Sequence, residues 1–246
     1  MPLDAVTELW GRLVGAQPDP PPLLVLLTGL LALAVVVTRL PWRIGRNAIT
    51  IAHEGGHALA ALLTGRRLQG IRLHSDTSGL TLSAGRPTGP GMVVTLLAGY
   101  VAPSLVGLAA AAVLAGNRIT LLLWVAVALL LAMLVMIRNV YGVLSVVVTT
   151  AVVLGVSWKA SPQVQAAFAY TGVWFLLIGG VRPVGELQAQ RRRGRAPQSD
   201  ADQLAWLTGV PGAVWVGLFA VVNLLALLAG AALLAGPALD TVSLPG

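Results

Sequence analysis

Long apolar runs separated by short polar segments dominate the chain. A membrane-spanning helix needs about 20 consecutive, mostly apolar residues, and seven runs meet or nearly meet this length. They lie at 21–38, 47–64, 91–116, 119–137, 140–158, 164–181 and 206–235. The fifth run follows the fourth almost directly, so six spans are the alternative. The pattern predicts an all-α polytopic membrane protein with about seven transmembrane helices.

A polar segment after the second run departs from the helical pattern. Ile71-Arg72-Leu73-His74 and Leu80-Thr81-Leu82-Ser83 alternate apolar and polar residues, and Asp76-Thr77-Ser78-Gly79 between them has the composition of a turn. Alternation with a period of two is typical of a strand with one buried face. We therefore predict a small β-hairpin inserted between two membrane helices.

The apolar runs and polar segments divide the chain into six successive parts. These are an N-terminal segment at 1–20, transmembrane helices 1 and 2 at 21–64, the β-hairpin insertion at 65–90, transmembrane helices 3 to 6 at 91–183, a basic loop at 184–203, and the last transmembrane helix with a tail at 204–246. Asp4 and Glu8 stand where a signal peptide would carry basic residues, so the first helix is expected to remain in the mature protein.

Composition supports a membrane protein made of helices. The 246 residues are 57% hydrophobic and 10% charged, whereas ordinary soluble domains carry roughly a quarter charged residues. An abundance of Leu, Val, Ala and Gly without long alternating segments favours packed helices over a transmembrane β-barrel. The chain has no cysteine, which excludes disulfides and a thiolate metal site. A metal would therefore be bound by His, Asp or Glu.

The net charge of +7 is explained by topology, so we expect no nucleic-acid binding. The basic residues lie mostly between apolar runs, where positive charge orients a membrane protein. With seven spans, eleven of them share the side of the hairpin and of the basic loop. The positive-inside rule then places this side and the N-terminus in the cytoplasm. We expect a multi-pass protein of the cell's inner (cytoplasmic) membrane, surrounded by lipid bilayer.

The second apolar run contains the pattern with the clearest chemistry, His53-Glu54-Gly55-Gly56-His57. On a helix the two histidines lie one turn apart, so both imidazoles can bind one metal ion with Glu54 beside its open position. Zinc bound in this way lowers the pKa of a water ligand, and Glu54 would accept the proton and pass it to the leaving amine. Ionisable residues inside a membrane helix are costly and usually mark a functional site.

Two glycines lie inside this motif. Each costs on the order of 1 kcal/mol in helix propensity relative to alanine, but glycine also lets another helix or an extended substrate approach closely. We expect Gly55 and Gly56 to pack against a neighbouring helix, which would enclose the site in protein.

The surroundings of the motif extend this interpretation. Ala52 to His57 in a membrane helix, followed by Leu63-Thr64-Gly65-Arg66 and a β-hairpin, resemble the site-2 protease group of intramembrane zinc metallopeptidases, in particular its bacterial M50B-like branch. Weaker similarities are Ala98-Gly99-Tyr100, Arg138 to Gly142 and Ser199 to Asp202, so that the resemblance covers most of 47–235. It implies a zinc-dependent metalloendopeptidase of regulated intramembrane proteolysis, which cleaves membrane-protein substrates in or near their transmembrane segments.

The third zinc ligand departs from the family's pattern. Family members usually take it from an aspartate in an Asn-Pro-Asp-Gly-like segment of a later helix, and this chain lacks that segment. The resemblance implies that Asn139 replaces the asparagine, which polarises the scissile carbonyl, but no aspartate follows it. Topology favours the acidic residues on the side toward which the zinc helix runs. We predict Asp200 as the ligand, with Asp202 or Asp76 as alternatives; Asp200 could instead simply cap the last helix.

Two functions compete at this point. The first is an intramembrane zinc metalloprotease whose hairpin presents an extended substrate through main-chain hydrogen bonds. The alternative, motivated by the missing aspartate segment, is a catalytically silent metal-binding scaffold or regulator in the membrane. The chain leaves no room for a PDZ-like or nucleotide-sensing module, so regulation is expected to come from a separate partner.

Overall fold

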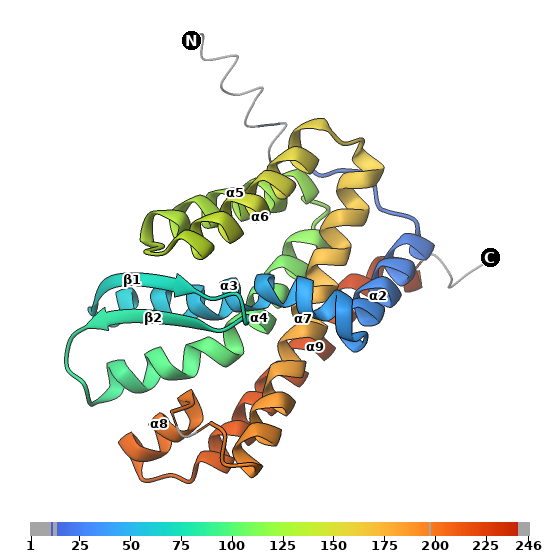
Figure 1. The fold of residues 1–246 in the computed structure, drawn as a ribbon. Helices are drawn as coiled ribbons and strands as arrows, with labels where there is room; N and C mark the ends of the chain where they lie inside the picture. The colour runs from blue at the N-terminus through green and yellow to red at the C-terminus, as the bar shows by residue number, and fades with distance from the viewer. Residues whose placement is uncertain (1–10, 12–13, 197, 241–246) are drawn as a thin grey trace.

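The computed structural model describes residues 11, 14–196 and 198–240, with side chains described up to residue 236. Asp4, Glu8 and Arg12, which entered the expectations about the mature N-terminus and the orientation, lie outside this part of the chain. The described elements are α2 (Pro22–Val37), α3 (Arg39–Leu63), β1 (Arg67–Leu73), β2 (Gly79–Ala84), α4 (Pro90–Ala115), α5 (Ile119–Met136), α6 (Val140–Lys159), α7 (Pro162–Arg192), α8 (Asp200–Thr208) and α9 (Gly212–Asp240) (Figure 1). The predicted helical membrane class with an inserted β-hairpin is confirmed.

The predicted count of seven spans is not confirmed. Among the described residues, five helices are long and apolar enough to cross a membrane: α4, α5, α6, α7 and α9. The helices α2 and α3 meet the criterion only as a pair, and they bend by 101° at the break between them, which raises the count to six if the pair crosses. With 16 residues, α2 is only about 24 Å long, shorter than the roughly 30 Å hydrocarbon core.

This bent pair leaves one part of the topology unchanged. Between the hairpin and the basic loop lie α4, α5, α6 and α7, each long enough to cross the membrane. Four crossings return a chain to the side on which it began. If each of these helices crosses, the hairpin and the basic loop share one side whether or not the bent pair spans the bilayer, and only the side of the N-terminal segment depends on that pair.

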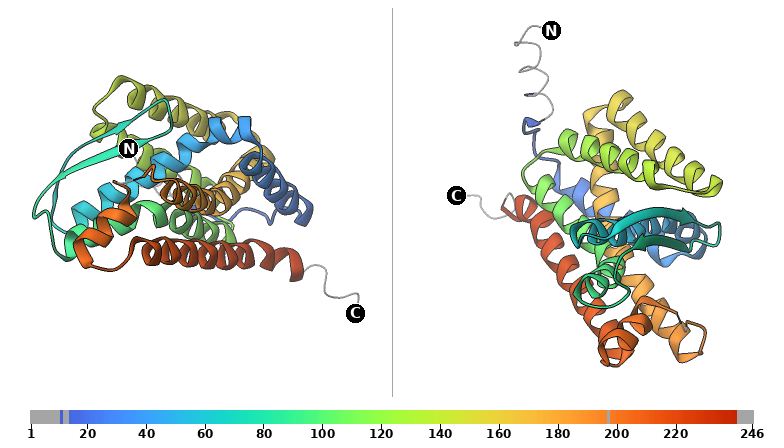
Figure 2. Two further views of the ribbon diagram at one scale, coloured as in Figure 1. Left: turned by 60° about the horizontal axis from the view of Figure 1, so that its bottom comes forward. Right: turned by 90° about the vertical axis from the view of Figure 1, so that its left-hand side faces the viewer.

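The helix α4 runs through the middle of the molecule and contacts α3, α7, α8 and α9 (Figure 2). Small residues allow these helices to approach. A Cβ added at Gly180 of α7 would overlap Ser104 of α4, and one added at Gly56 of α3 would overlap Ala102 and lie 2.9 Å from the carbonyl oxygen of Ala98. The expected close packing is thus found at Gly56. At Gly55 an added Cβ meets nothing within 4 Å, so the expectation was wrong there.

The hairpin lies between α3 and the junction of α5 with α6 (Figure 1). Its strands pair antiparallel, with Ile71 opposite Thr81 and Leu73 opposite Gly79. The outer side of β1 is engaged by the segment 137–139: Ile71 forms a parallel bridge with Ile137, and its carbonyl accepts a hydrogen bond of 2.8 Å from the Arg138 amide. Ile71 and Leu73 are buried, which fixes the hairpin over α3.

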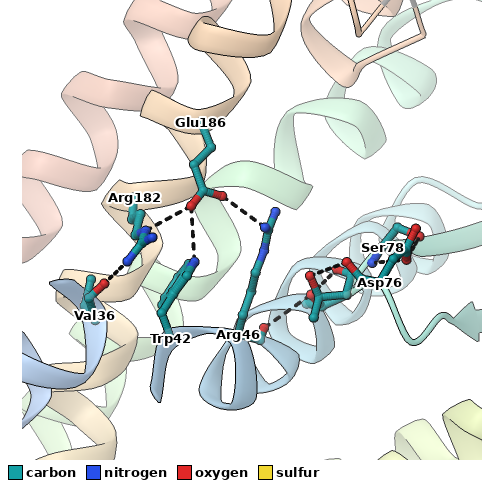
Figure 3. Close-up of polar contacts among 9 residues, drawn as sticks. Val36, Trp42, Arg46, Asp76, Ser78, Arg182 and Glu186 are labelled. Atoms are coloured by element: carbon teal, nitrogen blue, oxygen red, sulfur yellow. Dashed lines mark hydrogen bonds and ion pairs between the residues drawn. The ribbon is translucent and has the colours of Figure 1, made fainter. Parts of the chain in front are cut away.

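The polar first half of α3 is attached to α7 by a cluster of charged side chains (Figure 3). The Glu186 carboxylate forms ion pairs with Arg46 at 3.1 Å and Arg182 at 2.9 Å, and accepts a hydrogen bond of 3.2 Å from the Trp42 indole. Arg182 also donates to the Val36 carbonyl at the end of α2. Because charged groups are costly in a membrane helix unless they are paired, this cluster accounts for the arginine-containing start of α3.

Candidate metal centre

The C-terminal half of α3 presents the two histidines of the motif to α4. Their Nε2 atoms lie 3.1 Å apart, and the Nδ1 atom of His57 lies 2.7 Å from the carbonyl oxygen of Thr95 on α4. A carbonyl only accepts hydrogen bonds, so Nδ1 of His57 carries the proton. Its Nε2 atom faces His53 and Asp200 and is the atom that would bind a metal ion.

Asp200, the first residue of α8, completes the group. Its Oδ2 atom lies 3.4 Å from Nε2 of His53 and 3.3 Å from Nε2 of His57. Burial alone would raise the pKa of the Asp200 carboxyl, but the adjacent His57 and His53 outweigh it and hold that pKa well below its usual range. A carboxylate that binds a metal does so in its ionised form. The structure brings together the three residues that the sequence suggested as ligands.

The separations of the three ligand atoms test whether these residues fit zinc. Two imidazole nitrogens and one carboxylate oxygen, with one position left open, are a common donor set of catalytic zinc. Ligand atoms about 2.0–2.1 Å from one tetrahedral ion lie about 3.3 Å from one another. The separations here are 3.1, 3.3 and 3.4 Å. Donor type and spacing both fit a single zinc ion.

Gly99 of α4 provides the space next to the ligand atoms. A Cβ added at this position would overlap Nε2 of His57 and lie 2.7 Å from Nε2 of His53. Beside it, the Tyr100 ring meets His53 edge-on at 4.8 Å and stacks on Phe219 of α9 at 5.1 Å. In the sequence, Gly99 and Tyr100 stand out only as part of a weak similarity. A glycine within a membrane helix was the signal, but its role depends on which helix lies opposite.

Glu54 is buried against the second strand of the hairpin, with 3% of its surface exposed. The Thr81 hydroxyl donates a hydrogen bond of 2.6 Å to its Oε2 atom. Its other oxygen, Oε1, faces Gly79, where an added Cβ would overlap the carboxylate. The alternating pattern of β2 explains this geometry, because it turns Thr81 toward α3. The hairpin therefore orients the predicted catalytic base, a role that the sequence did not reveal.

The two alternative ligands, Asp202 and Asp76, make other contacts, away from the two histidines. Asp202 forms an ion pair of 2.6 Å with Arg191. Asp76 accepts hydrogen bonds from the Ser78 amide at 2.9 Å and hydroxyl at 2.6 Å, within the exposed hairpin turn (Figure 3). The N-cap of α8 is Ser199, so Asp200 does not fill the capping role that was its alternative. Neither Asp202 nor Asp76 belongs to the His-His-Asp group.

The predicted catalytic residue Asn139 has structural contacts. Its Nδ2 group donates a hydrogen bond of 2.7 Å to the Leu73 carbonyl, and its Oδ1 atom accepts one of 3.1 Å from the Leu73 amide. The side-chain amide thus extends the pairing of β1 beyond Ile137. A role on the scissile carbonyl stays a prediction.

These features define a class: a multi-pass helical membrane protein with a partly buried site of two histidines and one aspartate. A sequence model of the Peptidase M50B-like family matches residues 26–230. Because this match covers most of the chain, the protein belongs to the M50B-like peptidase family, and the resemblance drawn from the zinc motif is confirmed. Searches of curated proteins and of solved structures found no match.

Proposed function

We propose that the protein is a zinc-dependent intramembrane endopeptidase of the cell's inner membrane, which hydrolyses peptide bonds in or near transmembrane segments of other membrane proteins. One observation carries this proposal. His53, His57 and Asp200 converge at zinc-like separations in a chain of a peptidase family. Membership supports metallopeptidase chemistry, and the convergence supplies the third ligand that the family's usual segment does not provide here.

The chain's own groups divide the work of hydrolysis. His53, His57 and Asp200 would hold the zinc ion, which when bound supplies a Lewis acid and an activated water near neutral pH. The hydroxyl of Thr81 donates a hydrogen bond to Oε2 of Glu54 and so orients the carboxylate. Glu54 would take a proton from the attacking water and give it to the leaving nitrogen. Gly79 allows β2 to pack directly against this carboxylate, because a Cβ there would overlap Oε1.

An extended substrate fits the hairpin at β2. The outer side of β1 is already engaged by the segment 137–139, whereas β2 lies directly over Glu54. A peptide that adds to a sheet edge forms main-chain hydrogen bonds along its length. Pairing with β2 would bring its amide groups next to the catalytic base. Deleting residues 70–85 should then abolish cleavage, while Thr81→Val, which keeps the strand, should only reduce it; unchanged cleavage after the deletion would exclude this role.

One observation favours the silent alternative, a membrane scaffold that binds zinc without hydrolysis. The amide of Asn139, expected at the scissile carbonyl, is engaged by the main chain of Leu73. A scaffold would keep the His-His-Asp site but would not need Glu54 as a base. The two functions therefore differ in their dependence on a single carboxylate.

A Glu54→Gln variant tests this difference. The purified full-length protein and the variant are compared for bound zinc and for cleavage of single-span membrane substrates. We expect zinc to be retained and cleavage to fall by about 10²- to 10⁴-fold, the usual contribution of a general base. Asp19→Asn is the matched control, because Asp19 is exposed and bonds Asn117. Bound zinc without any Glu54-dependent cleavage would favour the scaffold, and absence of zinc would reject both.

A further inference from the structure

Asp200 belongs to a helix too short to hold its own position. The helix α8 has nine residues, and isolated helices of this length are marginal in water. Two of its residues, Ala201 and Leu204, are fully buried in a cluster that includes Leu96 of α4 and Phe219 of α9. These apolar contacts attach the first turn of α8 through Ala201 and its middle through Leu204. Apolar burial is not directional, so the orientation of Asp200 calls for a polar attachment as well.

An ion pair provides this attachment. Arg191, in the last turn of α7, donates hydrogen bonds from Nε to both carboxylate oxygens of Asp202, at 3.0 and 3.2 Å, and from Nη2 to Oδ1 at 2.6 Å. Both side chains are largely covered, with 18% and 27% exposed. A two-nitrogen contact with a carboxylate restrains direction as well as distance, so the start of α8 is oriented relative to the end of α7.

Two neighbours fix this pair further. The Ser199 hydroxyl donates a hydrogen bond of 2.6 Å to Oδ2 of Asp202. The Ser199 side chain in turn accepts a hydrogen bond from the Asp202 amide, so the ion pair is connected to the N-cap of α8. Gly212, at the start of α9, leaves the space that the guanidinium fills, because a Cβ there would overlap Nη2 of Arg191. The contact therefore joins the ends of α7, α8 and α9.

We propose that Arg191 is a positioning residue, whose ion pair with Asp202 holds Asp200 against His53 and His57. Two residues apart on a helix, Asp200 and Asp202 point to roughly opposite sides. The pair thus acts on the metal site only through the backbone of α8. This inference rests on the proposed zinc site and deepens it: the third ligand of this protein is supplied by a short docked helix and kept in place by a charge from α7.

Zinc affinity of the purified full-length protein, measured by competition with a chromophoric chelator, tests the proposal. Arg191→Gln should weaken zinc binding by about tenfold, at the lower end of the effect of residues that orient a ligand. Arg192→Gln, a change of the same type at an exposed neighbour, should leave it unchanged. Arg191→Lys keeps the charge but loses the two-nitrogen contact, so it should recover only part of the affinity. The absorption spectrum of bound Co²⁺ should change in Arg191→Gln and stay as in the parent in Arg192→Gln.

A double-variant cycle separates the ion pair from a general loss of folding. Asp202→Asn should weaken zinc binding as much as Arg191→Gln, and the double variant should be no weaker than either single one. Additive losses, or an Arg191→Gln affinity equal to that of the parent, would overturn the positioning role while leaving the zinc site intact. If Asp200→Ala also binds zinc like the parent, the proposed ligand set itself fails.

Discussion

The two sides of the metal site are built in different ways. Both histidines come from α3, a helix of 25 residues that packs closely on α4 at Gly56 and is bonded to Thr95 through His57. The aspartate comes from the nine-residue α8, whose first turn is held by an N-cap and an ion pair. Van der Waals packing along a long helix positions one side, and two buried side chains together with a few polar contacts position the other.

This difference separates the preformed part of the site, the two histidines, from the part that must dock, α8. Closely packed helices in a membrane tolerate little movement, because their contacts cover long surfaces. A short helix with few buried side chains belongs to the parts of a protein that open at the lowest free energy. The histidine pair is accordingly the fixed part of the site, and α8 is the part on which its completion depends.

Removing a ligand from either side should have the largest effect. We expect His57→Ala and Asp200→Ala each to lower zinc affinity by more than about a hundredfold, beyond the range of residues that only orient a ligand. The controls His74→Ala and Asp76→Ala remove the same residue types from the hairpin turn, where they contact Ser78. Chelator competition measures all four. Retained affinity in Asp200→Ala would mean that α3 alone holds the metal.

The second-largest effect is expected from crowding the histidine side of the site. In Gly99→Ala the added methyl group overlaps Nε2 of His57, and overpacking costs about 1–3 kcal/mol, so both zinc affinity and the thermal unfolding temperature of the metal-free protein should fall. Gly55→Ala adds a methyl group where nothing lies within 4 Å and should stabilise the helix by about 0.5–1 kcal/mol. If Gly99→Ala binds zinc normally, the histidine side is not rigid and the comparison fails.

The smallest effect is expected from pH on the docked side. Hydrogen bonds from Arg191 lower the pKa of Asp202 below its ordinary value of 3.8. A lowered pKa contributes stability above the unfolded value, and this contribution is lost as the pH falls through the folded value. Metal-free Asp202→Asn should therefore unfold at a lower temperature than the parent at pH 6. The difference in unfolding temperature between variant and parent should be small, because the group is partly exposed, and it should disappear in strong acid. A difference that does not change with pH would exclude the ion pair as its cause.

The sequence predicted the parts of the site that depend on local spacing. The His53–His57 interval places two imidazoles on one helical face, and alternation predicted the hairpin. Few acidic residues lie on the side toward which the zinc helix runs, and Asp200 is one of them. The structure places Asp200 at the two histidines. Helix period and strand period were sufficient for the first two features, whereas the scarcity of charge only narrowed the third ligand to Asp200, Asp202 or Asp76.

Features that depend on contacts between distant segments could not be predicted. The Glu186 cluster that attaches α3 to α7 joins residues far apart in the chain. Asn139 was expected at the substrate, yet its amide pairs with Leu73, because the segment after α5 lies beside β1. The role of Gly99 likewise depends on the histidines opposite it. In each case the residue was visible in the sequence, but its neighbour was not.

The location of Asp200 on α8 also sets an order of events during synthesis of the chain. Translation proceeds from the N-terminus, so His53 and His57 leave the ribosome and enter the membrane well before α7 and α8 exist. A nascent chain can offer zinc only the two imidazoles until Arg191 and Asp202 have been made and α8 has docked. The metal centre is therefore completed late, after most of the helices around it have been inserted.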